Sequence, residues 1–181
     1  MNWPNRITIA RVALIPVIVI LLQFDVSICR ALALVCFMVA SFTDWLDGYL
    51  ARKLQIVTNF GKFLDPVADK LLVLSTMIAL CGLGDFPAWV CIVVLFRELA
   101  VDGLRMVAVE QGHVIAAGKL GKIKTALQML TLILVLLDTR MFGDFPMTEL
   151  MIYASVAMTL WSGLDYFIRN GAVLKQGGRA A

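Results

Sequence analysis

Four aspartates lie close together in the chain, at spacings that would bring their side chains together on helices. Asp44 and Asp47 are three residues apart, and Asp65 and Asp69 are four residues apart, so each pair would share one helical face. Neighbouring carboxylates repel one another unless cations neutralise them. Mg²⁺ and Mn²⁺ prefer carboxylate oxygens and commonly share their coordination with substrate phosphates. The spacing therefore predicts a site for a pair of such ions, which suits displacement at phosphorus.

Small residues accompany the aspartates on the same two faces. Gly48 and Ala51 continue the first face, and Gly61 stands four residues before Asp65. Side-chain bulk is therefore missing where a ligand would have to approach the backbone closely. An alternative is that the aspartates only cap helices or pair with basic neighbours in a solvated loop. Those neighbours are Arg52, Lys53, Lys62 and Lys70.

The elements that would position these residues are membrane-spanning helices. The chain has 181 residues, 61% of them hydrophobic and 16% charged, with a mean hydropathy of +0.88, which is unlike a soluble domain. Its apolar runs are long enough to cross a bilayer as helices, and their lack of alternation favours helices over barrel strands. The six runs cover residues 7–24, 28–50, 60–83, 87–109, 120–138 and 147–168. We expect an all-α integral membrane protein with six transmembrane helices and a single domain over residues 1–181.

The ends of the second and third runs decide whether the four carboxylates meet. The second helix must continue beyond Asp47 to keep the first face intact. Pro66 would either open the third helix or kink a helix that begins near Thr58 or Asn59. The kinked helix is preferred because a helix that starts at Pro66 is barely long enough to span a bilayer. Two antiparallel helices would then direct the carboxylates toward one another just inside the membrane edge.

Basic residues gather on one side of the predicted bundle. If the N-terminus is cytoplasmic, that side carries Arg6, Arg11, Arg52, Lys53, Lys119, Lys122, Lys124, Arg169, Lys175 and Arg179. The other side keeps only Arg30 and Arg140. Since Lys and Arg near span ends are retained in the cytoplasm, both termini are expected there, and the polar active-site cavity is expected at the cytoplasmic side.

The aspartate stretch resembles the signature of the CDP-alcohol phosphatidyltransferase family, in which two Asp, a Gly, an Ala-Arg pair, a further Gly and two more Asp follow at fixed gaps. The matching residues are Asp44, Asp47, Gly48, Ala51, Arg52, Gly61, Asp65 and Asp69. Chain length and the six-run layout match as well, so the resemblance covers essentially the whole chain. It implies transfer of a phosphatidyl group from a CDP-linked lipid to an alcohol, with release of CMP, by a homodimer.

The resemblance also implies roles for individual residues. The four aspartates would hold the metal ions, and Asp69 would also take the proton from the attacking hydroxyl. The residues that would line the CDP-lipid site are Gly48, Ala51, Arg52 and Gly61. The N-terminal segment NRITIAR resembles a second family element, whose nucleotide-facing residues would be Asn5, Thr8 and Arg11. A plain helix cap is the alternative for this segment.

Charged side chains in the fourth and fifth runs bear on the identity of the alcohol. The basic ones are Arg97, Arg105, Lys122 and Lys124. Charges at membrane depth are costly and usually mark a site or the partner of one, and Glu98 and Asp102 do not balance these four cations. An acceptor that itself bears a phosphate would complete the balance. Alternatives are an internal salt-bridged network of Glu98, Asp102 and Arg105, and lysines that only extend to lipid headgroups.

The segments RE, GLR and GKIKT resemble the bacterial branch of the family that uses sn-glycerol 3-phosphate. This resemblance implies CDP-diacylglycerol and sn-glycerol 3-phosphate as substrates, phosphatidylglycerol phosphate as product, and a bacterial plasma (inner) membrane with the site facing the cytoplasm. Inositol phosphate and phosphatidylglycerol stay open as acceptors. A divalent-cation transporter is an alternative of another class, disfavoured because the outer halves of the runs offer no polar path. No nucleic-acid partner is expected.

Overall fold

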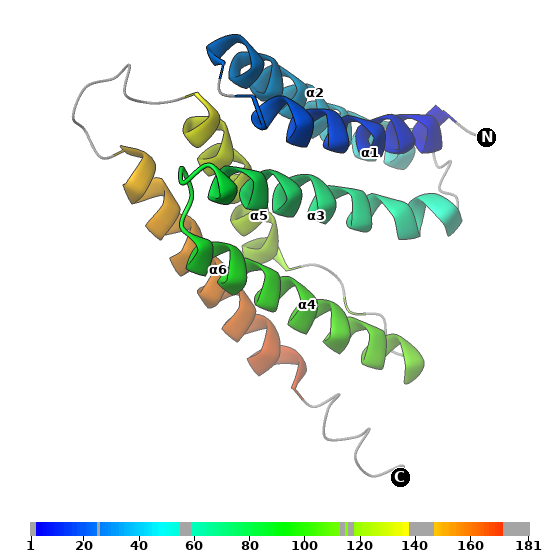
Figure 1. Ribbon diagram of the computed structural model, residues 1–181. Coiled ribbons are helices and arrows are strands. Elements are labelled where there is room, and N and C mark those ends of the chain that lie inside the picture. The colour runs from blue at the N-terminus through cyan, green and yellow to red at the C-terminus, as the bar shows by residue number, and fades with distance from the viewer. Residues whose placement is uncertain are drawn as a thin grey trace. The chain divides into compact units, whose positions relative to one another are not determined.

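The computed structural model shows six α-helices and, among the residues that it describes, no strand (Figure 1). The described residues are 3–24, 26–54, 59–112, 115, 118–137 and 147–171. Side chains are described for all of these except residues 3–6, 44–54 and 59–65. The predicted all-α class and its six helices are confirmed.

The helices follow the six apolar runs. Their bounds are α1 Trp3–Leu22, α2 Ser27–Leu54, α3 Asn59–Gly82, α4 Ala88–Glu110, α5 Lys119–Leu136 and α6 Met147–Asn170. α2 stays helical to Leu54, beyond the first pair of aspartates, as their spacing requires. α3 begins at Asn59 and contains Pro66, so the prediction of a helix that starts before this proline is confirmed.

The sequence predicts a membrane crossing for every helix. Within the described ranges, no helix combines the length and the apolar composition that a crossing needs. The transmembrane spans and the topology with both termini in the cytoplasm stay predictions.

The chain divides into two compact units. The first comprises Met1–Ala88 and Leu132–Phe145, and the second comprises Trp89–Thr131 and Pro146–Ala181. The helices α1, α2 and α3 therefore belong to the first unit, nearly all of α4 and all of α6 belong to the second, and α5 contributes to both. The single domain predicted over residues 1–181 stays a prediction.

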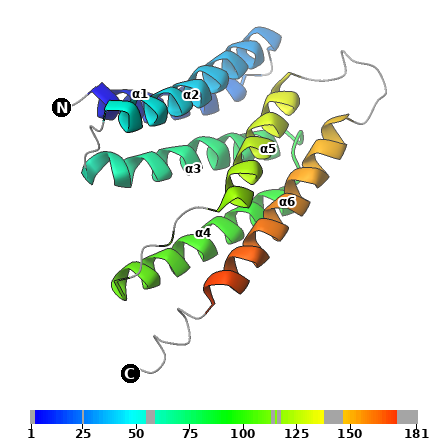
Figure 2. The same cartoon turned by 180° about the vertical axis from the view of Figure 1, so that it is seen from behind.

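In the first unit, α1 packs against both α2 and α3. Its buried side chains recur every three or four residues and so form one helical face. They are Thr8, Arg11, Ile15, Ile18 and Leu22. Both ribbon views place the N-terminal end of α1, the C-terminal end of α2 and the N-terminal end of α3 at the same end of this unit (Figure 1, Figure 2). The packing of α1 therefore brings the NRITIAR segment to the end of the unit that carries the aspartate stretch.

Arg30 joins three segments at the other end of α2. Its guanidinium donates hydrogen bonds to Oδ2 of Asp85 at 2.7 Å, to the carbonyl of Val135 at 2.7 Å and to the carbonyl of Leu136 at 3.2 Å. The last carbonyls of a helix have no partner within the helix, and a cation there also interacts favourably with the helix dipole. One side chain thus links α2, the loop that follows α3 and the end of α5.

Replacing this guanidinium should destabilise the protein measurably. We expect Arg30→Ala to lower the free energy of unfolding by about 2 kcal/mol, because the variant leaves a carboxylate and helix-end carbonyls without their donor. The measurement is the Tm of the purified variant. Arg169→Ala is the matched control, since it removes an ion pair with Asp165 in which the arginine side chain is 72% exposed, and such pairs contribute little. Equal Tm values for the two variants would contradict the role given to Arg30.

Candidate functional site

The predicted metal ligands lie on two helices that contact each other in the first unit. Asp44 and Asp47 are in α2, near its C-terminal end, and Asp65 and Asp69 are in α3, near its N-terminal end. The side chain of Asp69 is half-buried, whereas those of the other three aspartates lie outside the described residues. Among the described side chains, no three acidic, histidine or cysteine groups gather into a metal site. The convergence of all four carboxylates therefore stays a prediction.

The predicted contacts to the CDP-lipid lie at the same end of the first unit. Three of them are in α2 and one is in α3: Gly48, Ala51, Arg52 and Gly61. Their side-chain environment and that of Asn5 lie outside the described residues. Thr8 and Arg11 are described, and each is only 1% exposed.

The burial of Arg11 gives the first unit a cation at its aspartate end. No side chain buried to this degree is larger among the described residues, and a charged group at such depth requires polar or oppositely charged neighbours. Arg11 lies in the N-terminal half of α1, which both views place beside the ends of α2 and α3 that carry the aspartates (Figure 1, Figure 2). The structure therefore brings the two sequence elements that resemble the family signature to one place.

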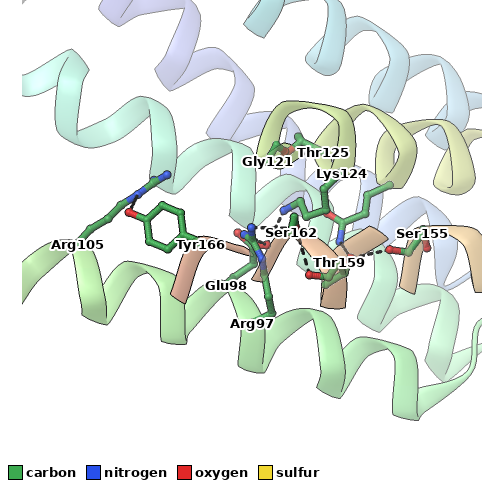
Figure 3. Close-up of polar contacts among 11 residues, drawn as sticks. Arg97, Glu98, Arg105, Gly121, Lys124, Thr125, Ser155, Thr159, Ser162 and Tyr166 are labelled. Carbon is green, nitrogen blue, oxygen red and sulfur yellow. Dashed lines mark hydrogen bonds and ion pairs between the residues drawn. The ribbon is translucent and has the colours of Figure 1, made fainter. Parts of the chain in front are cut away.

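In the second unit, a buried glutamate binds two of the predicted acceptor contacts. Glu98 in α4 is 7% exposed, and its Oε1 accepts a hydrogen bond from Nζ of Lys124 in α5 at 2.5 Å. The same oxygen accepts one from Nη1 of Arg97 at 3.1 Å, and Nη2 of Arg97 donates to Oγ of Ser162 in α6 at 3.1 Å (Figure 3). Glu98 thus belongs to an internal salt-bridged network, but its described partners are Arg97 and Lys124 and not the Arg105 considered from the sequence. With Ser162, this network joins α4, α5 and α6.

Buried polar side chains also connect α5 and α6 beyond the Glu98 network. Nε2 of Gln128 in α5 donates to Oγ1 of Thr159 in α6 at 3.0 Å, and Thr159 Oγ1 donates to the carbonyl of Ser155 at 2.7 Å. All three side chains are buried. Small hydroxyl residues let helices approach closely and satisfy polar groups where water is absent. The α5–α6 interface therefore contains buried polar contacts in addition to the Glu98 network of the same unit.

Gly163 leaves space for the side chain of Arg97. A Cβ atom at this position would lie 3.1 Å from Cγ of Arg97 and 3.7 Å from its Nε. Because Arg97 is also held by Glu98 and Ser162, it has little freedom to move aside. The absence of a side chain at Gly163 is therefore part of what fixes the arginine.

Arg105 is held differently from Arg97. Its Nε donates to the hydroxyl of Tyr166 in α6 at 3.1 Å, and its Cζ lies 5.4 Å from the centroid of the Tyr166 ring (Figure 3). Lys122 is exposed at the start of α5. The structure thus separates the four predicted phosphate contacts: Arg97 and Lys124 share one carboxylate, whereas Arg105 and Lys122 do not take part in that network.

Sequence reasoning missed the contribution of α6. The residues of α6 that contact the charged side chains of α4 are Ser162, Gly163 and Tyr166. One signal was available, because the polar residues of this apolar run recur at helical spacing: Ser155, Thr159, Ser162 and Tyr166. This spacing predicts a polar face, although it does not show which helix that face contacts.

The family of the chain follows from comparison with known proteins. The family model described as CDP-alcohol phosphatidyltransferase matches residues 1–161. The chain belongs to the CDP-alcohol phosphatidyltransferase family. The resemblance of its aspartate stretch to the family signature is therefore confirmed, and the protein is an enzyme of this class.

Several relatives of this phosphatidyltransferase align over most of their length. The CDP-diacylglycerol–glycerol-3-phosphate 3-phosphatidyltransferase of Bacillus subtilis (strain 168) is 45% identical over 96% of this chain and 97% of its own. The protein of the same name from Rickettsia typhi is 38% identical, with 92% of this chain and 95% of its own covered. CDP-diacylglycerol–glycerol-3-phosphate 3-phosphatidyltransferase 2 of Arabidopsis thaliana is 36% identical, with 94% and 80% covered.

Neutralising Glu98 should destabilise the second unit of this phosphatidyltransferase. We expect Glu98→Gln to lower the free energy of unfolding by about 3 kcal/mol, because Lys124 and Arg97 would stay buried without the negative charge of Glu98. The measurement is the unfolding transition of the purified variant. Glu110→Gln, at an exposed position of the same helix, is the matched control and should change little.

A second variant distinguishes lost charge balance from lost shape. Replacing Lys124 by Met in the Glu98→Gln protein removes one of the two cations that Glu98 pairs with, so it should restore part of the lost stability. A Glu98→Gln protein as stable as the control, or a double variant less stable than Glu98→Gln alone, would show that the network does not hold these helices.

Proposed function

We propose that this protein transfers the phosphatidyl group of CDP-diacylglycerol to sn-glycerol 3-phosphate, which yields phosphatidylglycerol phosphate and CMP. The observation that carries this proposal is the 45% identity to a CDP-diacylglycerol–glycerol-3-phosphate 3-phosphatidyltransferase over 96% of the chain. The eight residues of the family signature, all present here, support the reaction class independently.

The acceptor assignment is supported by the cations of the second unit. Arg97 and Lys124 both pair with the carboxylate of Glu98, and Arg105 contacts the hydroxyl and ring of Tyr166. A phosphate monoester supplies the negative charge that these cations favour, and guanidinium groups bind it with paired hydrogen bonds. Within this proposal Arg105 and Lys122 contact the phosphate, and Glu98 fixes Arg97 and Lys124 beside them.

The first unit would bind the CDP-lipid and a pair of Mg²⁺ or Mn²⁺ ions. The donor set fits these ions, because α2 and α3, which pack together, each carry two aspartates of the stretch, and hard cations prefer carboxylate oxygens. When bound there, the ions share the negative charge of the pyrophosphate and make its β-phosphorus easier to attack. Asp44, Asp47, Asp65 and Asp69 would hold them.

The residues of the chain then serve binding and proton transfer. The acceptor hydroxyl oxygen forms a bond to the β-phosphorus, the bond from that phosphorus to the bridging oxygen breaks, and CMP leaves with this oxygen. Asp69 accepts the hydroxyl proton as the new bond forms, because a free alkoxide is too unstable at neutral pH. Thr8 and Arg11, together with the small residues Gly48, Ala51 and Gly61, would hold the cytidine diphosphate close to the backbone.

The proposal includes a membrane location. Every helix exposes large apolar side chains, among them Phe42 at 61%, Phe96 at 75%, Trp161 at 67% and Ile168 at 82% exposure. Such surfaces are covered by lipid or by partner proteins far more often than by water. The distribution of Lys and Arg favours both termini and the active site at the cytoplasmic face. The family resemblance implies a bacterial plasma (inner) membrane and a homodimer.

The reaction can be tested with purified protein. CMP release from CDP-diacylglycerol should require both sn-glycerol 3-phosphate and Mg²⁺ or Mn²⁺, and a chelator should stop it until either ion is restored. Inositol phosphate and phosphatidylglycerol are supplied one at a time as competing acceptors. Release with one of these instead would keep the reaction class and overturn the acceptor. Ion transport without CMP release would favour the transporter alternative.

Asp69→Asn serves as the inactive variant in this experiment. It should abolish CMP release while largely sparing CDP-lipid binding, because the amide keeps the shape of the side chain but cannot accept the proton. Asp165→Asn, which alters a surface pair, is the matched control and should retain activity. Full activity of Asp69→Asn would exclude this aspartate as the base.

A further inference from the structure

Tyr166 holds the guanidinium of Arg105 at two points. Its hydroxyl accepts a hydrogen bond from Nε at 3.1 Å, and its ring lies under the guanidinium carbon, 5.4 Å from the ring centroid (Figure 3). The hydrogen bond restrains the Nε edge of the guanidinium, and the cation–π contact restrains the orientation of its plane. Arginine otherwise has considerable rotamer freedom, which it would lose on binding a ligand.

These two contacts do not use the Nη1 and Nη2 atoms of Arg105. No described group accepts a hydrogen bond from Nη1 or Nη2 of Arg105, and the side chain is only half-buried. These are the atoms that bind two oxygens of a phosphate in parallel. Arg97 offers a contrast, because both of its Nη atoms donate to protein groups.

Tyr166 is rigid enough to act as a support. It is 7% exposed and belongs to a buried cluster with Val101 and Leu104 of α4, against which Ile115 and Phe167 also pack. A tyrosine ring buried in this way needs a partner for its hydroxyl, and Arg105 supplies that partner. The hydroxyl position, and with it the direction of Arg105, is therefore set by the packing of α6 on α4.

We propose that Tyr166 is a positioning residue that aims Arg105 at the phosphate of the acceptor. The inference rests on the proposed function and adds a residue to it, because Tyr166 reaches the substrate only through Arg105. Preorganisation of this kind raises affinity for the acceptor by lowering the entropy lost on binding. It does not alter binding of the CDP-lipid.

The test is Tyr166→Phe, which removes the hydroxyl and keeps the ring. The KM for sn-glycerol 3-phosphate should rise roughly three- to tenfold, the effect of one hydrogen bond, while kcat and the KM for CDP-diacylglycerol stay close to wild type. Tyr153→Phe is the matched control on the same helix, since Tyr153 is 61% exposed and stacks on Trp89 through its ring alone. It should leave all three constants unchanged.

A double-mutant cycle shows whether Tyr166 acts through Arg105. In an Arg105→Ala background, Tyr166→Phe should have no further effect on the acceptor KM. A full additional increase there would overturn the proposal, because Tyr166 would then act independently of Arg105. An unchanged acceptor KM in the single variant would overturn it as well, and so would an equal rise in both KM values, which indicates general loss of structure.

Failure of this inference is distinguishable from failure of the proposed function. Wild-type protein that releases no CMP with sn-glycerol 3-phosphate would overturn both. Wild-type turnover together with an unaltered acceptor KM in Tyr166→Phe would overturn only the role of Tyr166.

Discussion

The buried carboxylate of Glu98 is the constraint on which the arrangement of the second unit depends. An ionised group at this depth must be paired, because its desolvation costs several kcal/mol. Lys124 from α5 and Arg97 from α4 meet at one of its oxygens, and Arg97 extends to Ser162 in α6. These contacts tie α4, α5 and α6 to one another within the second unit. The side chain of Arg97 also occupies the space that the missing side chain of Gly163 leaves.

In the first unit, the negative charges of the aspartate stretch need to be balanced. Its aspartates lie at the ends of α2 and α3, where the N-terminal half of α1 adds the buried Arg11. Arg11 alone does not neutralise four carboxylates, so they need further cations, either basic side chains of the same stretch or metal ions. In the proposed function metal ions supply them, and the same ions then neutralise the pyrophosphate. Charge balance within this unit and binding of the CDP-lipid would thus share one physical basis.

Local sequence patterns were sufficient to predict the six helices and the family of the chain. The apolar runs predicted six helices, and the requirement that α3 be long predicted its start before Pro66, which the structure confirms. The spacing of the signature residues was sufficient to indicate the family, which the match over residues 1–161 confirms. These features depend on periodicity and composition, which a single sequence contains.

Contacts between distant segments could not be predicted in the same way. Arg30 binds the last carbonyls of α5, which lie about a hundred residues later in the sequence. Arg97 and Arg105 contact residues of α6 that lie more than sixty residues later. The sequence indicated that the basic residues of the fourth and fifth runs outnumber the acidic ones. It did not indicate that Arg97 and Lys124 would share Glu98 or that Arg105 would pack on Tyr166. Such pairing depends on which helix faces meet, and nothing in the spacing along one helix specifies the other.

The claim most directly open to measurement is that the second unit holds the phosphate of the acceptor. Steady-state kinetics of Arg105→Ala should show a KM for sn-glycerol 3-phosphate raised roughly tenfold or more, the effect of losing charge-assisted hydrogen bonds, with the KM for CDP-diacylglycerol nearly unchanged. An equal effect on both constants, or no effect on either, would contradict the account.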